Sequence, residues 1–367
     1  MPAVNRFAIS AALAVLTLLA SAGPASARVP GSFFGMVWDR GVTRAPASAQ
    51  EQQWALMQQS GVRTVRTVFR WAAVQPVAGG PLDWSSTDAL VGYAAANKIE
   101  LLPVVLGAPG WAAVGPPVYG ATPKRVGDYA AFMRELVMRY GPAGTFWAEN
   151  PQLPRRPLRT WQIWNEPHLD FYWNVLDRGR NAWVREYPRL LKAATPAIKA
   201  ADPGATVVLA GLADFAWRHL TRLNRRGIRG SFDVAAINLF TSTPRRVLKG
   251  VRLFRRAMAR GGESRRPVWL TETTWPAARG RVAVPKTSWQ RGWYTTDAGM
   301  ARRLRSFYAL AARRRRALRL QRVYWYTWAS AYGDGDLFDY SGLVKYTAGG
   351  VSERPALAAY ARIARGN

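Results

Sequence analysis

The chain has 367 residues, a formal net charge of +30 at pH 7 and no cysteine. Disulfide bonds, thiol catalysis and cysteine-ligated metals are therefore excluded, and stability must come from a large packed core. The positive charge predicts attraction to polyanions: acidic polysaccharide, anionic cell wall, a lipid surface or nucleic acid.

The N-terminus has the pattern of a secretory signal peptide. Arg6 supplies a positive charge, an apolar stretch runs from Phe7 to Ala20, and Ala25-Ser26-Ala27 is typical of a cleavage site. We expect residues 1–27 to be the signal and residues 28–367 to form the exported mature domain. An uncleaved N-terminal anchor is the alternative. No later stretch approaches the ~20 apolar residues of a spanning helix, so no transmembrane segment is expected once the signal is removed.

Eight short apolar stretches follow, each succeeded by a helical pattern. The predicted strands are 33–38, 62–71, 101–106, 161–166, 206–210, 232–240, 268–272 and 323–328. The predicted helices are 49–59, 85–97, 128–140, 182–200, 215–223, 246–259, 296–313 and 353–364. Pro188 and Pro196 lie inside the fourth of these helices, which we expect to be kinked or split.

This alternation predicts an α/β fold with parallel strands, and eight units predict a single (β/α)8 TIM barrel. An open doubly wound sheet is the alternative, but it usually carries a glycine-rich phosphate turn after its first strand. Gly35 and Gly41 do not form that fingerprint.

Two glutamates end apolar strands beside an aromatic residue and a proline. The stretch Trp161–Pro167 stops at Glu166, because Pro167 cannot donate to a sheet and disfavours helix. The stretch Val268–Pro276 repeats the pattern around Glu272. Strand ends meet at one face of a barrel, so we predict that the two carboxyl groups face each other across its mouth. Such a pair suits glycosidic-bond hydrolysis, although a surface glutamate at a strand–loop junction is the alternative for each.

The sequence Trp164-Asn165-Glu166-Pro167, with Thr271-Glu272 later, resembles the retaining glycoside hydrolases of clan A, which are TIM barrels. Val65-Arg66 on the second strand and Pro109-Gly110-Trp111 after the third also resemble this clan. Family 39 is the most similar, followed by family 5 (cellulase-like). The resemblance implies a retaining glycosidase with Glu166 as acid/base, Glu272 as nucleophile and Asn165 bonding the sugar 2-hydroxyl. It implies no cofactor.

The sequence departs from the family at two places. The sixth strand of such enzymes often ends in His-x-Tyr, with the tyrosine hydroxyl contacting the nucleophile. Here Ile237-Asn238-Leu239-Phe240 stands there, and Phe240 has no hydroxyl, so Tyr324 or Tyr326 would have to supply it. The chain also ends after its eighth helix, without the extra β-domain that family 39 xylosidases tend to carry.

Further residues at strand ends predict substrate binding. The candidates are Arg66, Asn165, His168, Trp111, Asn238, Trp275 and Trp328. Arg66 would hold the nucleophile ionised, and Trp328 would form the platform beneath the cleaved sugar, because indole faces stack on sugar rings. Trp71 and Trp325 also lie at strand ends, and Trp161 and Trp269 are expected in the core. Core packing is the alternative for each tryptophan.

No metal site is predicted. His168 and His219 are far apart in the sequence, and we expect them to be far apart in space. Asp334-Gly335-Asp336 with Asp339 resembles a loose Ca²⁺ loop but lacks the glutamate of an EF-hand, so a turn-rich loop over the active site is expected.

The expected partner is a carbohydrate: acidic polysaccharide or cell-wall glycan from the charge, with several subsites and endo action from the tryptophans. Export makes nucleic acid the least favoured partner, and a monomer is expected. The expected location is extracellular or cell-wall associated. Two alternatives to an enzyme remain: an inactive barrel that binds carbohydrate or cell wall, and a basic protein that associates with surfaces through charge. Alternatively, the net charge has no binding role and reflects solubility or a compositional preference for arginine.

Overall fold

The computed structural model describes residues 29–39, 47–174, 179–285, 288, 290–333, 335–348 and 350–366. The predicted signal peptide lies outside these residues. No helix in the described part of the chain combines the length and the apolar character needed to cross a bilayer.

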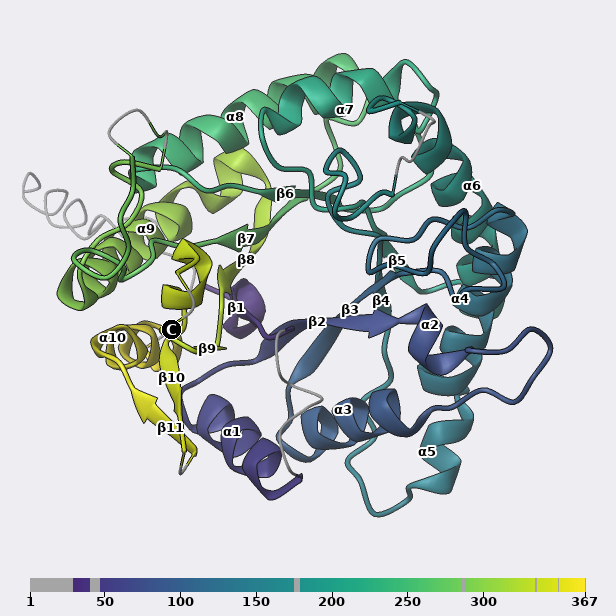
Figure 1. The fold of residues 1–367 in the computed structure, drawn as a ribbon, viewed down its shortest axis with the longest axis horizontal. Coiled ribbons are helices and arrows are strands. Elements are labelled where there is room, and N and C mark those ends of the chain that lie inside the picture. The colour runs from purple at the N-terminus through teal and green to yellow at the C-terminus, as the bar shows by residue number, and fades with distance from the viewer. Residues whose placement is uncertain are drawn as a thin grey trace, which may run out of the picture.

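Eight parallel strands form the predicted barrel, and helices surround it (Figure 1). The strands are β1 (Phe34–Val37), β2 (Thr64–Arg70), β3 (Glu100–Leu106), β4 (Thr160–Ile163), β5 (Thr206–Val208), β6 (Ala235–Asn238), β7 (Val268–Thr273) and β8 (Leu320–Tyr326). Their order in the sheet is β5-β4-β3-β2-β1-β8-β7-β6. Isolated bridges from Val208 to Val234 and from Leu212 to Ile237 join β5 to β6 and close the ring. The open doubly wound alternative is therefore excluded.

The outer layer consists of helices. They are α1 (Ala47–Gln59), α3 (Ser85–Ala96), α4 (Val126–Tyr140), α6 (Trp183–Ala201), α7 (Ala216–Asn224), α8 (Pro244–Arg260), α9 (Asp297–Leu318) and α10 (Pro355–Arg365). Two short helices, α2 (Trp71–Val74) and α5 (Thr145–Glu149), interrupt loops, and 3-10 turns occur at η1 (Gly31–Phe33) and η3 (Leu337–Tyr340). The helix predicted at 182–200 as kinked or split is not split, because α6 continues through Pro188 and Pro196.

A small sheet between β8 and α10 was not predicted. It comprises β9 (Ala329–Ser330), β10 (Val344–Thr347) and β11 (Gly350–Glu353), where β10 and β11 form an antiparallel hairpin. These strands have two to four residues each, too short to give a clear alternating pattern.

The barrel interior is filled by side chains that point inward from the strands. Its apolar cluster comprises Val37, Leu102, Val208, Val234, Ala236, Trp269, Tyr324 and Tyr326. A larger apolar layer lies between the strands and the helices and contains Trp161. The core positions predicted for Trp161 and Trp269 are therefore confirmed, because Trp161 is 0% exposed and Trp269 is 3% exposed.

Candidate active site

β2 directs Arg66 into the barrel, where it is 2% exposed. Its guanidinium donates three hydrogen bonds: Nε to Gln162 Oε1 at 2.7 Å, Nη1 to Glu272 Oε1 at 2.6 Å, and Nη2 to Asn165 Oδ1 at 2.8 Å. The planar fork of the guanidinium makes these bonds geometrically demanding, so Arg66 is held in one orientation. The expected pairing of Arg66 with Glu272 is present.

A strained turn after β4 positions Glu166. Trp164 and Glu166 have φ angles of 70° and 39°, a left-handed region that side chains other than glycine rarely adopt and that is found at functional sites. The Glu166 backbone N–H donates to the Gly211 carbonyl at 3.0 Å, just past β5. The Glu166 side chain is 6% exposed, and its Oε1 accepts from Asn238 Nδ2 at 2.8 Å.

Glu272 lies on β7 itself, and a strand irregularity brings Asn238 beside it. The register between β6 and β7 shifts between Ile237 and Asn238, so that Asn238 pairs with Glu272. Thr271 Oγ1 donates to Asn238 Oδ1 at 2.7 Å. Because its oxygen is occupied, the Asn238 amide turns its nitrogen toward Glu166. The barrel thus brings Glu166 and Glu272 into one network.

Electrostatics separate the two carboxyl groups. Burial, followed by the charge of Glu272, raises the pKa of Glu166 to about 8. Burial also raises the pKa of Glu272, to about 7, while Arg66 opposes this rise. Since the guanidinium bonds Glu272 and not Glu166, Glu272 is the group that ionises first, and Glu166 is the group that keeps its proton.

Further charged and phenolic side chains surround the pair. The charge of Asp39, which follows β1, raises the pKa of Glu272, and the charge of Asp214, which follows β5, raises that of Glu166. Burial and the charges of both glutamates raise the pKa of Tyr172 well above its usual value. The sequence analysis did not select these residues, although the position of each aspartate just after a strand was a usable signal.

Tyr119 and Arg70 lie farther from the two glutamates and contact each other. The Arg70 guanidinium lies 4.6 Å from the centre of the Tyr119 ring, a cation–π distance. The ring of Tyr119 also stacks on Phe171, with centroids 5.1 Å apart. Phe171 is 64% exposed and provides an apolar face on the loop after β4.

Asn165 is placed beside the pair, as predicted. It is 3% exposed, and its Oδ1 accepts from Arg66 and, at 3.3 Å, from Asn238 Nδ2. These two contacts leave the amide Nδ2 as the group oriented for a further acceptor. The predicted bond to a sugar hydroxyl therefore requires donation from that nitrogen.

The tryptophan predictions need correction. Trp328 and Trp275 are both 0% exposed. The indole of Trp328 donates to Gln53 Oε1 at 3.1 Å, and that of Trp275 donates to the Thr241 carbonyl at 2.7 Å. A buried ring with an occupied N–H offers no face to a sugar, so both residues are core. Trp111 is half-buried, and its indole donates to the Gln75 carbonyl at 3.0 Å.

The expectation that His168 and His219 are far apart is wrong. Their rings stack with centroids 4.4 Å apart. Burial lowers the pKa of His168 to about 3 and that of His219 to about 4, so both are neutral at pH 7. Both ring nitrogens of His168 are buried, which does not fit the predicted bond to a substrate hydroxyl. Within the described ranges, no three histidine or carboxylate side chains gather as a metal site.

Phe240 occupies an aromatic cluster rather than a hydrogen-bonding position. Its ring contacts Phe338, Trp293 and Tyr326, with centroids 5.0, 5.6 and 6.2 Å away. Tyr324 does not replace the missing hydroxyl, because its OH pairs with Thr64 Oγ1 at 3.1 Å, nearer the start of β2.

The loop that resembled a Ca²⁺ site forms a capped turn. Asp336 accepts from the Phe338 backbone N–H at 3.0 Å and so caps η3, and Asp339 is 8% exposed. Asp334 lies outside the described residues. The Phe338 ring packs 5.5 Å from Tyr326 at the end of β8, which places this loop over the mouth.

Comparison with known proteins adds solved structures of the same fold. A scan of family models and a search of curated proteins found no match. A family 39 glycoside hydrolase from the gut symbiont Bacteroides cellulosilyticus is similar in structure, with a TM-score of 0.64 and 18% identity over 92% of this chain. This chain spans 64% of that enzyme.

Two further structures extend the comparison. A monomeric β-xylosidase from Caulobacter crescentus has a TM-score of 0.60 and 18% identity, covering 90% of this chain and 67% of that one. A GH5_18 protein from Bifidobacterium longum, in complex with Manb1-4GlcNAc, has a TM-score of 0.63 and 18% identity, covering 91% and 78%. These similarities show a shared barrel.

Proposed function

We propose that this protein is a secreted retaining glycosidase, with Glu166 as acid/base and Glu272 as nucleophile. The observation that carries the proposal is that two buried glutamates have different hydrogen-bond donors: the Arg66 guanidinium bonds Glu272, and the Asn238 amide bonds Glu166. The similarity in fold to family 39 and family 5 glycoside hydrolases supports it.

The mechanism has two steps. In the first, a Glu272 carboxylate oxygen attacks the anomeric carbon, the glycosidic C–O bond breaks, and the leaving oxygen takes the Glu166 proton. In the second, Glu166, now a carboxylate, takes a proton from water, the water oxygen attacks the anomeric carbon, and Glu272 leaves. Two inversions restore the original anomeric configuration. The carboxyl groups of a retaining pair stand about 5 to 5.5 Å apart.

The charges at the mouth favour a neutral sugar at the cleaved bond. Asp39 and Asp214 add two carboxylates to the catalytic pair. The opposing guanidinium groups are Arg66, which bonds Glu272, and Arg70, which lies over the Tyr119 ring. An acidic sugar would meet repulsion there. This separates the substrate question from the net charge of the whole chain.

Glu166→Ala and Glu272→Ala test the assignment. Glu272→Ala should abolish turnover of all glycosides. Glu166→Ala should abolish hydrolysis of natural glycans yet retain activity on dinitrophenyl glycosides, whose leaving group needs no proton. NMR of the first-formed product should show the starting anomeric configuration. Wild-type hydrolysis by either variant would overturn the proposal and leave the barrel as a carbohydrate-binding protein.

A further inference from the structure

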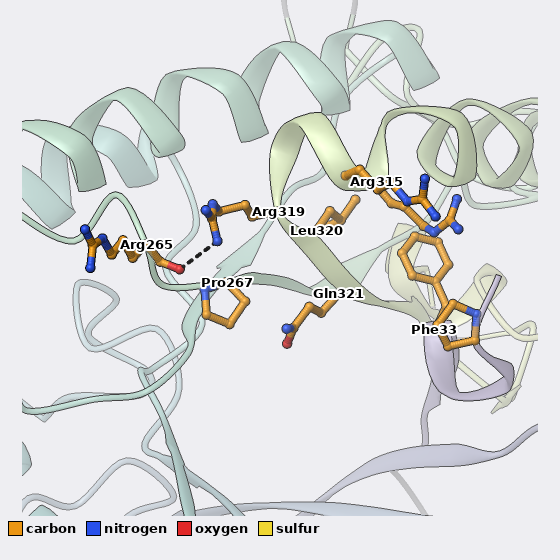
Figure 2. A pocket seen from close by; sticks show the side chains of 9 residues that line it. Phe33, Arg265, Pro267, Arg315, Arg319, Leu320 and Gln321 are labelled. Carbon is orange, nitrogen blue, oxygen red and sulfur yellow. Dashed lines mark hydrogen bonds between the residues drawn. The ribbon is translucent and has the colours of Figure 1, made fainter. Parts of the chain in front are cut away.

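A cavity of about 270 Å³ opens at the base of the barrel, near the start of β8 (Figure 2). Four arginines line it: Arg265, Arg315, Arg316 and Arg319. No carboxylate stands among the described residues of its lining, which otherwise consists of Pro30, Phe33, Pro267, Leu320 and Gln321. The cavity is therefore a concentrated positive site.

The local backbone gathers these arginines. Arg319 follows the last turn of α9 with a φ of 48°, and its Nη1 donates to the Arg265 carbonyl at 3.1 Å. The C-terminus of α9 carries partial negative charge, which favours cations nearby. That interaction favours the cluster of like charges, and no carboxylate stands among the described lining residues.

Three further pockets adjoin this cavity or one another through shared or sequence-neighbouring lining residues, and we call the four pockets together the track. A second pocket, of about 700 Å³, shares Arg265 and Pro267 with the first. Gly31 and Ser32 lead from the Phe33 side of the first cavity into a third pocket, of about 510 Å³. A fourth, of about 600 Å³, shares Arg156 with the third and adds further arginines.

The carboxylates along this track are already paired. Glu100 bonds Arg322 at 2.7 Å. Glu263 bonds Arg266 at 2.8 Å, and Asp233 bonds Lys199 at 2.8 Å and Arg266 at 3.3 Å. Basic side chains therefore outnumber carboxylates along the described track, whereas the aspartates and glutamates described above lie at the mouth.

We propose that the base of the barrel is a docking site for a linear acidic polysaccharide, separate from the mouth. Guanidinium groups bind carboxylates in bidentate pairs, and a connected track of pockets suits an extended chain with repeating charges better than a single small anion. The base of the barrel would then bind an anionic glycan, while the active site at the mouth of the barrel stays accessible to a neutral glycan.

Other polyanions fit the base less well. Among the residues that the structure describes, the most exposed large apolar side chains are Val77, Val118, Met138, Phe171 and Phe215. None of them lines the track, so it offers neither the apolar residues that insert into membranes nor the exposed rings that stack on unpaired bases. The choice of a glycan over other polyanions rests on the proposed glycosidase function.

The test compares two sets of four neutralised cations in the full chain. The base variant carries Arg265→Gln, Arg315→Gln, Arg316→Gln and Arg319→Gln. The control carries Arg245→Gln, Lys249→Gln, Arg252→Gln and Arg256→Gln, which are exposed positions along α8. The double variant Arg265→Gln/Arg316→Gln serves if the fourfold base variant does not fold. Affinity for polygalacturonate is measured by biolayer interferometry at low and high salt, with dextran as the neutral polymer.

The base variant should lose affinity for polygalacturonate roughly tenfold or more, since four ion pairs at the protein surface contribute together. The control should change less than about twofold, because it removes equal charge at residues that do not line the track. Equal losses in both variants would overturn the site in favour of net charge alone. Tighter, arginine-dependent binding to phosphatidylglycerol vesicles or single-stranded DNA would overturn the choice of ligand.

Hydrolysis of a neutral aryl glycoside separates this proposal from the proposed function. Both fourfold variants should retain the wild-type rate, and Glu272→Ala should still bind polygalacturonate. Docking without any hydrolysis by the wild-type protein would refute the glycosidase and leave the base site standing.

Discussion

A single methyl group at Gly211 should lower activity without touching either glutamate. An ideal Cβ there would stand 2.6 Å from Asn238 Oδ1 and 2.9 Å from its Nδ2. Ordinary contacts begin near 3.4 Å, so the amide must retreat by about 0.8 Å, which is 3.4 minus 2.6. That movement can stretch the 2.8 Å bond to Glu166 beyond hydrogen-bonding range.

The expected cost follows from the bond that is lost. Glu166 is the protonated acid, so the lost bond joins two neutral groups and contributes about 0.5–1.5 kcal/mol; Gly211→Ala should therefore lower kcat/KM roughly 2- to 13-fold. The basic limb of the pH profile should also move upward, because Asn238 lowers the pKa of Glu166. Initial rates on an aryl glycoside across the pH range around this pKa measure both effects.

A matched glycine controls for strain. Gly35→Ala would clash equally, with its Cβ 2.6 Å from a Tyr324 ring carbon, but Tyr324 does not contact the glutamates. It should reduce thermal stability and leave kcat/KM of the folded protein near wild type. In a double-mutant cycle, Gly211→Ala should add little to Asn238→Ala. Full additivity, or unchanged kcat/KM in folded Gly211→Ala, would refute the reasoning.

Three further predictions follow from the site. On the basic side of its pH profile, kcat/KM should fall with an apparent pKa near 8, that of Glu166. If Glu166→Gln shows the same fall on dinitrophenyl glycosides, a group other than Glu166 causes it. The folded-state pKa of Glu166 is raised above the usual value of 4.5 for a glutamate, so its contribution to stability is full below pH 4.5 and is lost as pH rises toward about 8. The free energy of unfolding, measured with denaturant across this window, should fall with pH in the wild type and fall less in Glu166→Gln. Trp328→Ala should destabilise the fold by about 3–5 kcal/mol, as large core truncations do, with KM of the folded variant unchanged; a raised KM with normal stability would restore the sugar platform.

The barrel and the two glutamates could be predicted because they depend on patterns along the chain. Strand periodicity fixes the number of βα units, and parallel closure brings the ends of β4 and β7 to one face. The role of Asn238 could not be derived this way. It arises from a one-residue register shift between β6 and β7 that no local pattern announces.

The predicted positions of the tryptophans and histidines were wrong for a related reason. Residues near a strand end alternate between the mouth and the helical layer, and the sequence does not show which side Trp275 or Trp328 takes. Similarly, sequence separation is a poor guide to distance in a closed ring, so the stacking of His168 on His219 was missed.

The closure of the ring has a consequence for motion. β2 and β3 pair along their whole length, whereas two isolated bridges join β5 to β6. Glu166 belongs to the half-barrel that ends at β5, and Glu272 belongs to the half that begins at β6. The bonds from Asn238 to Glu166 and from Arg66 to Glu272 therefore also fasten the two halves together. Local opening at this junction would separate Glu166 from Glu272, and amide hydrogen exchange should be faster there than along β2 and β3.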